Sequence, residues 1–355
     1  MRDSNFNQQK AEAFSESLLD TLNKSAIALA LSIGDRCGLF KVLANLPAST
    51  SKQIAAAANL NERYVREWLG TMVTGRVVNY FPETQTYQLP AEHASFLTDE
   101  GEYNFASAMQ FVPVLAGVED KLVECFEKGG GVPYSAYPRF QEVMAKESDQ
   151  TTVAGLEPFI LPLVPGLKEK LDAGIEVLDV GCGAGRAMLK LAASFPKSNF
   201  AGYDFSEEGI SSANAEAKRL GLENIRFEVR DAANIGESDR YDLITSFDAI
   251  HDQADPAGML RSVAAALKAD GVYLVQDITG SSYLEKNLDL PVAPWLYTIS
   301  LTHCMTVSLA YEGQGLGAMW GEEMCVEMLK AAGFRDVSLS HLDHDFMNTY
   351  YVATK

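Results

Sequence analysis

A histidine and an aspartate follow the predicted strand Tyr241–Phe247, where the end of a strand can present side chains to a ligand. An imidazole has an unperturbed pKa near about 6.5, so His251 can accept a proton from a hydroxyl or a thiol at neutral pH. We therefore expect His251 and Asp252 to be catalytic. The structural alternative is a histidine that caps the next helix or hydrogen-bonds within the fold.

A glycine-rich turn lies earlier in the chain. The predicted strand Glu176–Val180 leads directly into Gly181, Gly183 and Gly185, and the predicted helix Ala187–Ser194 follows. Because glycine has no side chain, main-chain atoms can approach a ligand here, at a helix N-terminus and at the carboxyl edge of a sheet. The turn alone does not identify the ligand, because similar turns bind NAD or FAD or are purely structural.

Two acidic residues narrow the choice of ligand. Asp179 lies two residues before the first glycine, where a carboxylate repels a diphosphate but attracts the ammonium group of an amino acid. Asp204 ends the next strand, about 20 residues on, where a carboxylate can accept hydrogen bonds from both hydroxyls of a ribose. A ribose without a diphosphate fits this pattern.

The other side chains expected at this ligand also follow strands. Asp231 and Ala232 come at the end of the third strand, where they can meet the exocyclic amine of an adenine and leave room for its ring. Phe205 and Phe247 are candidate stacking faces for that ring. Together with Asp179, Asp204 and the three glycines, they form the predicted cofactor site.

Strands and helices alternate from residue 173 to the C-terminus, which predicts a parallel sheet wrapped by helices. The segments Val337–Leu339 and Tyr350–Val352 are expected to close the sheet as an antiparallel hairpin. The predicted fold class is α/β with a Rossmann-like domain over 173–355. A helical linker or cap over 99–172 and a mainly α domain over 1–98 precede it.

The N-terminal domain is predicted to be a winged helix. Lys24–Leu46 has helical periodicity, with Ala26, Leu29, Ala30, Ile33 and Cys37 on a face expected in the core. Two short helices, with N-caps near Ser51 and at Asn61, and a hairpin over 77–89 follow.

The glycine turn with its acidic strand ends resembles class I S-adenosylmethionine-dependent methyltransferases. His251, Asp252 and Asp255 resemble the catalytic loop of small-molecule O-methyltransferases related to plant caffeate and hydroxyindole enzymes. Gln253 departs from the aromatic residue usual there, so the substrate class is not carried over. The resemblance implies S-adenosylmethionine as cofactor and S-adenosylhomocysteine as product. It also implies a small-molecule acceptor and a homodimer formed through the N-terminal domain.

The chain is also similar to bacterial methyltransferases of the same layout, in the loop 131–134 and the segment 315–321. The resemblance to the O-methyltransferases implies that the segment around His303 lines the acceptor site. Aromatic residues from separate segments would complete a partly closing site. The predicted substrate-binding residues are Tyr134, Tyr137, Trp295, His303, Met305 and Trp320.

Composition excludes several other classes. The net charge of −19 repels a phosphate backbone, and the helix that would read DNA, Asn61–Met72, carries no net charge, so nucleic acid is not an expected partner. No apolar run approaches the roughly 18 residues of a membrane span. The polar start Met1–Asn7 lacks a signal-peptide core, so cytoplasm is the expected location. The five cysteines are scattered, which predicts neither disulfides nor a metal site.

Two alternatives to a hydroxyl-methylating enzyme stay open. A small thiol ionises near neutral pH and depends less on a base, so an S-methyltransferase fits the same residues. A winged-helix regulator that senses S-adenosylmethionine without turning it over is the alternative from another class.

Overall fold

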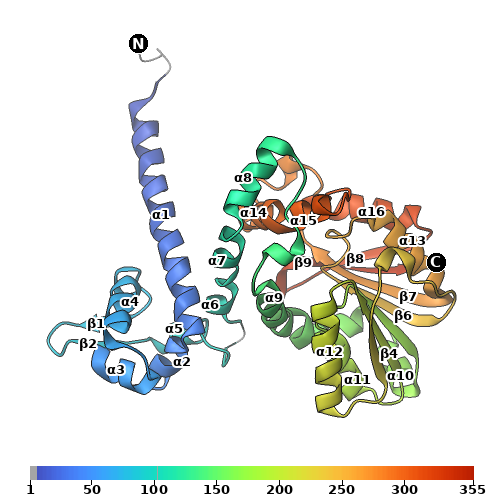
Figure 1. Cartoon of the computed structure of the whole chain (residues 1–355), viewed down its shortest axis with the longest axis horizontal. Helices are drawn as coiled ribbons and strands as arrows, with labels where there is room; N and C mark the ends of the chain where they lie inside the picture. The colour runs from blue at the N-terminus through green and yellow to red at the C-terminus, as the bar shows by residue number, and fades with distance from the viewer. Residues whose placement is uncertain (1–5, 102) are drawn as a thin grey trace. The chain divides into compact units, whose positions relative to one another are not determined.

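The computed structural model describes residues 6–101 and 103–355 and separates into two compact units, Met1–Val114 and Leu115–Lys355 (Figure 1). The predicted boundaries at 98/99 and 172/173 stay predictions. Residues 1–5 of the polar N-terminal segment lie outside the described part. Among the described residues, no helix combines the length and apolarity needed to cross a membrane.

The first unit contains a long helix, shorter helices and a two-stranded hairpin, which confirms the predicted winged-helix order. Asn7, Thr50 and Asn61 cap helices with their side chains, and Thr50 forms a capping box with Gln53. The elements are α1 (Gln8–Arg36), α2 (Leu39–Ala44), α3 (Ser51–Ala58), α4 (Glu62–Thr74), β1 (Asn79–Phe81), β2 (Thr86–Gln88), α5 (Ala91–Ala94) and α6 (Phe105–Ala108).

Helix α1 corrects two predictions. The predicted single helix Lys24–Leu46 is wrong. Helix α1 begins at Gln8, and Gly38, which has a φ of 67°, separates α1 from α2. The predicted buried face is also wrong in part, since Leu29 and Ile33 are 45% and 46% exposed.

The reason for this exposure is the packing of small residues on Trp68. The Trp68 indole N–H donates to the carbonyl oxygen of Ala30 at 2.8 Å. A Cβ added to Gly34 would lie 2.5 Å from the same ring, so only glycine fits there. Ala30 and Gly34 therefore face the domain, and the larger apolar residues of α1 face outward.

Helices and turns connect the first unit to the sheet of the second. Helix α7 (Phe111–Ala116) crosses the boundary between the units, and a run of three glycines at 129–131 follows α8. The elements of this stretch are α8 (Glu119–Lys128), η1 (Tyr134–Ala136), α9 (Phe140–Ser148), η2 (Asp149–Val153), η3 (Leu156–Ile160), η4 (Leu161–Leu163) and α10 (Leu167–Ala173).

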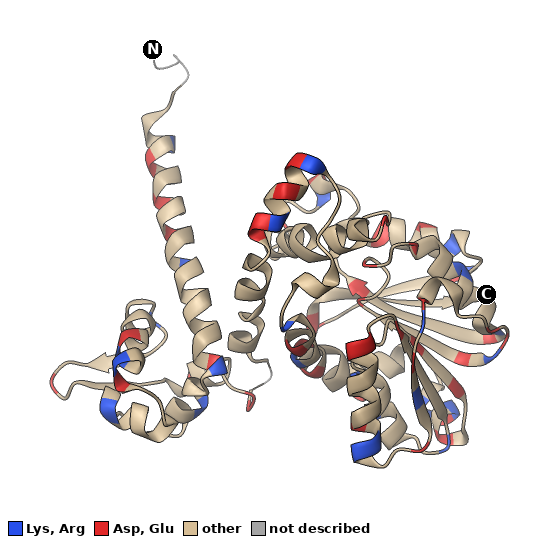
Figure 2. Cartoon of the chain, viewed as in Figure 1, with Lys and Arg blue, Asp and Glu red and all other residues tan. Residues whose placement is uncertain are grey.

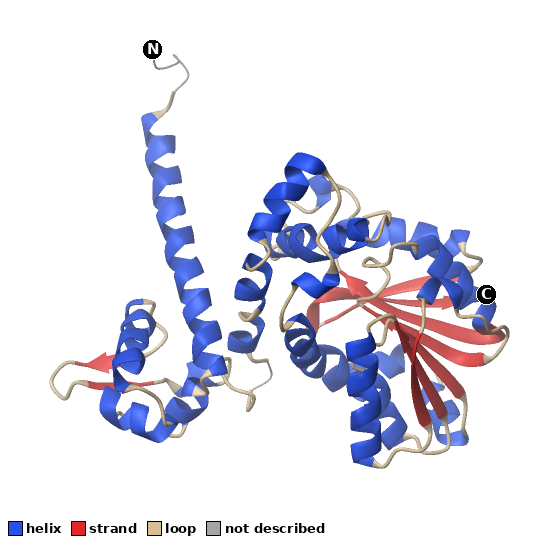
Figure 3. Ribbon diagram, in the orientation of Figure 1, coloured by secondary structure: helices blue, strands red, loops and turns tan. Residues whose placement is uncertain are grey.

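The second unit is built on a seven-stranded sheet with the order β5-β4-β3-β6-β7-β9-β8 (Figure 3). Strands β5 to β7 in this order run parallel, and β9 runs antiparallel to both β7 and β8, which confirms the predicted hairpin. The strands are β3 (Glu176–Val180), β4 (Asn199–Asp204), β5 (Ile225–Val229), β6 (Tyr241–Phe247), β7 (Leu267–Ile278), β8 (Asp336–Leu342) and β9 (Asp345–Thr354).

Helices cover both faces of the sheet, because the parallel strands carry apolar side chains on both faces. Leu178 packs with α13 and α16 on one face, and Val177 packs with α10, α11 and α12 on the other. The helices and turns of this domain are α11 (Arg186–Ser194), α12 (Glu207–Leu220), η5 (Ala232–Asn234), α13 (Pro256–Ala266), η6 (Leu284–Lys286), α14 (Ala293–Ile299), η7 (Ser300–Cys304), α15 (Met305–Ala310), η8 (Ala318–Trp320) and α16 (Gly321–Ala331).

Candidate active site

The three glycines after β3 all have left-handed φ values, 78°, 51° and 69°. A Cβ on Gly181 would lie 2.4 Å from Cβ of Ala249, and one on Gly185 would lie 2.4 Å from the ring of Phe227. Gly183 has no heavy atom within 3.9 Å of that position. The outer glycines therefore allow close packing, and the middle one leaves the backbone accessible to a ligand.

Asp204 is held beside this turn by two backbone groups. Its Oδ2 accepts a hydrogen bond from the Gly183 amide, and its Oδ1 accepts one from the Ser206 amide, both at 2.8 Å. Each carboxylate oxygen keeps a further lone pair, so the anchored side chain can still accept bonds from a ligand.

Asp179 is buried behind the same turn. Burial raises the pKa of its carboxyl to about 7, although a 2.7 Å hydrogen bond from the Thr245 hydroxyl acts in the opposite direction. A cationic group next to Asp179 would favour its charged form and lower this pKa again. The Asp179 carboxyl is therefore suited to bind a cationic group.

The other predicted cofactor residues lie at the same edge of the sheet. Asp231 caps the turn η5 by accepting from the Ala233 amide at 2.9 Å, while Ala232 is buried in the core. Phe205 is half-exposed, and Phe247 packs partly buried against the cluster of α10, α11 and α12. Their contact with a cofactor stays a prediction.

His251 lies between two carboxylates. Its Nδ1 is 2.6 Å from Oδ1 of Asp277, and its Nε2 is 3.3 Å from Oδ1 of Asp252. The Trp320 indole N–H donates to the same Asp277 oxygen at 3.0 Å. Trp320, which was predicted to bind substrate, is thus buried behind Asp277 and fixes the acid that holds the imidazole.

Asp277 lies near the end of β7 and is absent from the predicted site. The available signal was its type and position: an acidic residue at the carboxyl end of the strand next to β6. Burial alone would lower the pKa of His251, but the charges of Asp277 and Asp252 outweigh it and raise that pKa well above its ordinary value. The two carboxylates therefore favour the protonated form of this imidazole.

A second imidazole lies on η7. The ring of His303 stacks on Phe140 with centroids 3.7 Å apart and planes 7° apart, and the edges of Tyr134 and Tyr137 pack around it. The Tyr137 hydroxyl donates to the Thr302 carbonyl at 2.7 Å. The structure thus brings His303, Tyr134 and Tyr137 together, and their contact with a methyl acceptor stays a prediction.

Trp295 and Met305 complete the predicted set. Trp295 lies on α14 and Met305 starts α15, and both are partly buried. The substrate-binding role of both residues stays a prediction.

His251, Asp252 and Cys304 place one ligand atom each within 4.8 Å of one another, a spacing that suits a metal ion. Zinc binds cysteine as thiolate. Burial raises the pKa of the Cys304 thiol to about 12, which opposes thiolate formation. The sequence-based expectation of no metal site stays a prediction.

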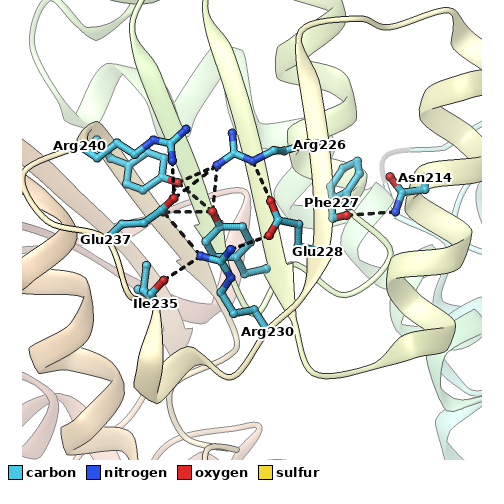
Figure 4. Close-up of polar contacts among 10 residues, drawn as sticks. Asn214, Arg226, Phe227, Glu228, Arg230, Ile235, Glu237 and Arg240 are labelled. Carbon is cyan, nitrogen blue, oxygen red and sulfur yellow. Dashed lines mark hydrogen bonds and ion pairs between the residues drawn. The ribbon is translucent and has the colours of Figure 1, made fainter.

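An ion-pair network supports the loop that carries Asp231 (Figure 4). Glu237 accepts hydrogen bonds from the Tyr241 hydroxyl at 2.5 Å and the Tyr203 hydroxyl at 3.0 Å, and it pairs with Arg240. Arg230 lies 3.9 Å from Glu237. Burial opposes ionisation of Glu237, but these hydrogen bonds and charges lower its pKa overall.

The network connects two strand ends of the predicted cofactor site. Tyr203 directly precedes Asp204 at the end of β4, and its ring lies 4.2 Å from the Arg230 guanidinium. Arg230 directly precedes Asp231 and donates to the Ile235 carbonyl at 2.8 Å. Glu237 therefore helps to fix the positions of Asp204 and Asp231 relative to each other.

Two family models match the chain. Residues 25–99 match the Rv2258c-like winged HTH domain, and residues 171–316 match a methyltransferase domain. The chain therefore combines a winged helix-turn-helix domain with a methyltransferase domain of the S-adenosylmethionine-dependent class.

Curated relatives align with part of the chain. The malonyl-[acyl-carrier protein] O-methyltransferase of Bacillus cereus is 27% identical over 159 residues, which are 44% of this chain and 52% of that protein. The alignments thus span about half of the length of the first curated relatives.

Solved structures match nearly the whole chain. A putative O-methyltransferase of Nostoc punctiforme has a TM-score of 0.73 at 20% identity, with 96% of this chain and 98% of that chain covered. Human N-acetylserotonin methyltransferase, solved in complex with S-adenosylmethionine, has a TM-score of 0.69 at 18% identity, with 99% of both chains covered. At these identities the likeness shows the shared fold.

We predict that Glu237→Gln weakens binding of S-adenosylhomocysteine by about five-fold, because the arginines around residue 237 lose a counter-charge and the Asp231 loop loosens. Isothermal titration calorimetry measures the effect. The matched control is Glu216→Gln, which removes an exposed pair with Arg219 on α12. Equal affinities of both variants and the unaltered protein would contradict the positioning role.

Proposed function

We propose that this protein is an S-adenosylmethionine-dependent methyltransferase that methylates an oxygen or sulfur atom of a small molecule, with His251 as general base. One observation carries the proposal. The imidazole of His251 is bonded to a buried carboxylate at the sheet edge where Ala249 packs directly on Gly181 of the glycine turn. The candidate base and the candidate cofactor turn are therefore immediate neighbours.

The residues present fit this cofactor. Asp179 suits the ammonium of its amino-acid part, Asp204 suits the ribose hydroxyls, and Asp231 suits the adenine amine. The accessible backbone at Gly183 permits close approach. When bound, S-adenosylmethionine supplies a methyl group on a sulfonium that is already a good leaving group.

The role of His251 is to accept the proton that the acceptor loses, at one of its two ring nitrogens. With Nδ1 donating to Asp277, Nε2 is the ring nitrogen that can take the proton of a hydroxyl during methyl transfer. The Asp277 carboxylate stabilises the imidazolium that forms and keeps the ring in the required tautomer. Asp252 adds a second negative charge beside Nε2.

The charges on α4 favour the enzyme over a DNA-binding regulator. In α4, Arg63 pairs with Glu67, and Arg66 lies 3.5 Å from Glu62. Figure 2 shows basic and acidic positions mixed along this helix, without a basic stripe. The arginines that would contact phosphates are thus already paired within their own helix.

We predict that His251→Ala lowers turnover of an alcohol or phenol by about 10²–10⁴-fold and turnover of a thiol much less, because only the hydroxyl needs a base. Release of S-adenosylhomocysteine from a panel of phenols, hydroxy acids and thiols measures this. Turnover of a hydroxyl acceptor by the variant at the unaltered rate would remove His251 from the mechanism.

The raised pKa of His251 also predicts a pH profile. The imidazole accepts a proton only when neutral, so kcat should rise with pH through a value above the ordinary 6.5 or so and then level off. Asp252→Asn removes one of the charges that raise this pKa and should move the rise down by about one pH unit. A profile that does not move in this variant would contradict the assignment.

We also propose that the protein is a homodimer held through α1. Phe14, Leu18, Leu22, Leu29 and Ile33 are exposed and spaced on one face of this helix. A continuous apolar stripe of this kind marks an association surface.

We predict that Leu22→Glu dissociates this dimer, because it places a charge in the middle of the stripe. Sedimentation equilibrium measures the mass of the particle. Asn23→Glu, which adds the same charge outside the stripe, is the matched control and should leave the dimer intact. A monomeric unaltered protein would refute the proposal.

A further inference from the structure

A fully buried amide lies directly before Asp277 on β7. The Gln276 side chain has no exposed surface, and each end of its amide has a hydrogen-bond partner. Its Nε2 donates to Oδ2 of Asp248 at 2.9 Å, and its Oε1 accepts from the Thr152 hydroxyl at 2.8 Å. A buried amide is costly when its groups are unpaired, so these two contacts fix the position of the side chain.

Gln276 holds Asp248 at two points. Besides the side-chain bond, the Asp248 amide donates to the Gln276 carbonyl at 3.0 Å. Asp248 has a φ of 50°, a left-handed value that few residues other than glycine adopt. A conformation of this kind persists only where surrounding contacts enforce it. The two hydrogen bonds from one partner therefore hold the start of the loop after β6.

This double contact acts on the pair of His251 and Asp277, because the two residues follow closely in the chain. Asp277 comes directly after Gln276, and His251 lies three residues after Asp248. The two residues between Asp248 and His251 are buried, so they have little freedom to absorb a displacement. A movement of Asp248 away from Gln276 would thus lengthen the 2.6 Å contact between His251 and Asp277.

Thr152 fixes the orientation of the amide from its other end. It is buried on η2, a π-helical turn of a kind that is often found at functional sites. The turn is anchored to α11, because the Arg186 guanidinium donates to the Asp149 carboxylate through two nitrogens. The Lys190 ammonium donates to the Val153 carbonyl at 2.7 Å. Thr152 thus lies between two residues tied to the helix that follows the glycine turn.

Asp248 receives the bond from Gln276 as a neutral acid. Burial and then the charge of Asp277 raise the pKa of the Asp248 carboxyl well above its ordinary range, while the charge of His251 acts in the opposite direction. The charges of Asp345 on β9 and of Asp252 add to the rise. The contact between Gln276 and Asp248 therefore depends on hydrogen bonding, and a neutral replacement at 276 changes no charge near the imidazole.

We propose that Gln276 is a positioning residue for the reaction, because its amide holds the loop of His251 against Asp277. The amide acts through this pair and needs no contact with the methyl donor or the acceptor. The role in turnover rests on the proposed methyltransferase function. The inference assigns a task to Gln276, Thr152 and Asp248, which neither the cofactor residues nor the proton transfer itself uses.

The pKa of His251 reports the closeness of Asp277, so it provides a direct test. Gln276→Met keeps a side chain of similar length but removes both hydrogen bonds. We expect the pKa of His251 to fall by about one pH unit, because the charge of Asp277 raises it most at close contact. NMR titration of the full chain measures this pKa, and the spectrum of His251→Ala identifies the signal among the five histidines.

Turnover gives a second readout of the same variant. Gln276→Met should lower kcat for a phenol or hydroxy acid that the unaltered protein methylates by about ten-fold, because the base is no longer held in place. The rise of kcat with pH should move to lower pH together with the pKa, since the imidazole becomes neutral earlier. The affinity for S-adenosylhomocysteine in calorimetry should not change, because the cofactor residues keep their contacts.

Tyr273→Phe is the matched control. The Tyr273 hydroxyl also makes a buried hydrogen bond from β7 to β6, to Ser246 at 3.0 Å, but this partner lies within the strand and not in the loop after it. The variant should keep the pKa of His251. Thr152→Val removes only the hydroxyl and should give a smaller fall than Gln276→Met, whereas Thr152→Ser retains the hydroxyl and should restore the pKa.

The outcomes separate this inference from the proposed function. An unchanged pKa of His251 in Gln276→Met, an equal fall in Tyr273→Phe, or an unchanged kcat overturns the positioning role. If Gln276→Met does not fold, the Thr152 variants decide, and an equal pKa in Thr152→Val and Thr152→Ser overturns it. A protein that binds no S-adenosylmethionine overturns the proposed function instead, while the NMR titration, which needs no turnover, still tests the contact.

Discussion

The short contact between His251 and Asp277 is the interaction on which the candidate site depends. Both side chains are buried, so neither can exchange its partner for water, and an unpaired charge there would be costly. Their distance is set by the backbone, because the Asp248 amide donates to the Gln276 carbonyl at 3.0 Å where β6 and β7 end. The sheet register therefore determines the chemistry of the imidazole.

Contacts between β3 and β6 position the cofactor turn in the same way. Thr245 of β6 donates to Asp179 of β3, and Ala249 packs where Gly181 has no side chain. A larger residue at position 181 would push the loop of His251 away from the glycine turn. Close packing of neighbouring parallel strands thus brings a group suited to a cation and a group suited to proton transfer to one sheet edge.

Sequence patterns predicted most of the strands and helices that carry the site, but fewer of the side-chain contacts within it. The bounds of β3 and β6 are as predicted, because these segments have strong periodicity and defined ends. The exposure of Leu29 was not predictable, since periodicity cannot tell a face that meets the core from one that meets solvent or another chain. Asp277 could have been noted as an acidic residue near the end of a strand, but its contacts with His251 and Trp320 join segments far apart in the sequence, which no local pattern encodes.

The two histidines show how environment, and not residue type, separates their roles. Both imidazoles are buried near Asp252, yet the pKa of His251 is raised and that of His303 is lowered to about 4. The difference arises because His251 has a second carboxylate, Asp277, in direct contact, whereas aromatic rings surround His303. Titratable neighbours driven apart in this way take different parts in one reaction. The imidazole of His251 is therefore suited to proton transfer, whereas the imidazole of His303 stays neutral.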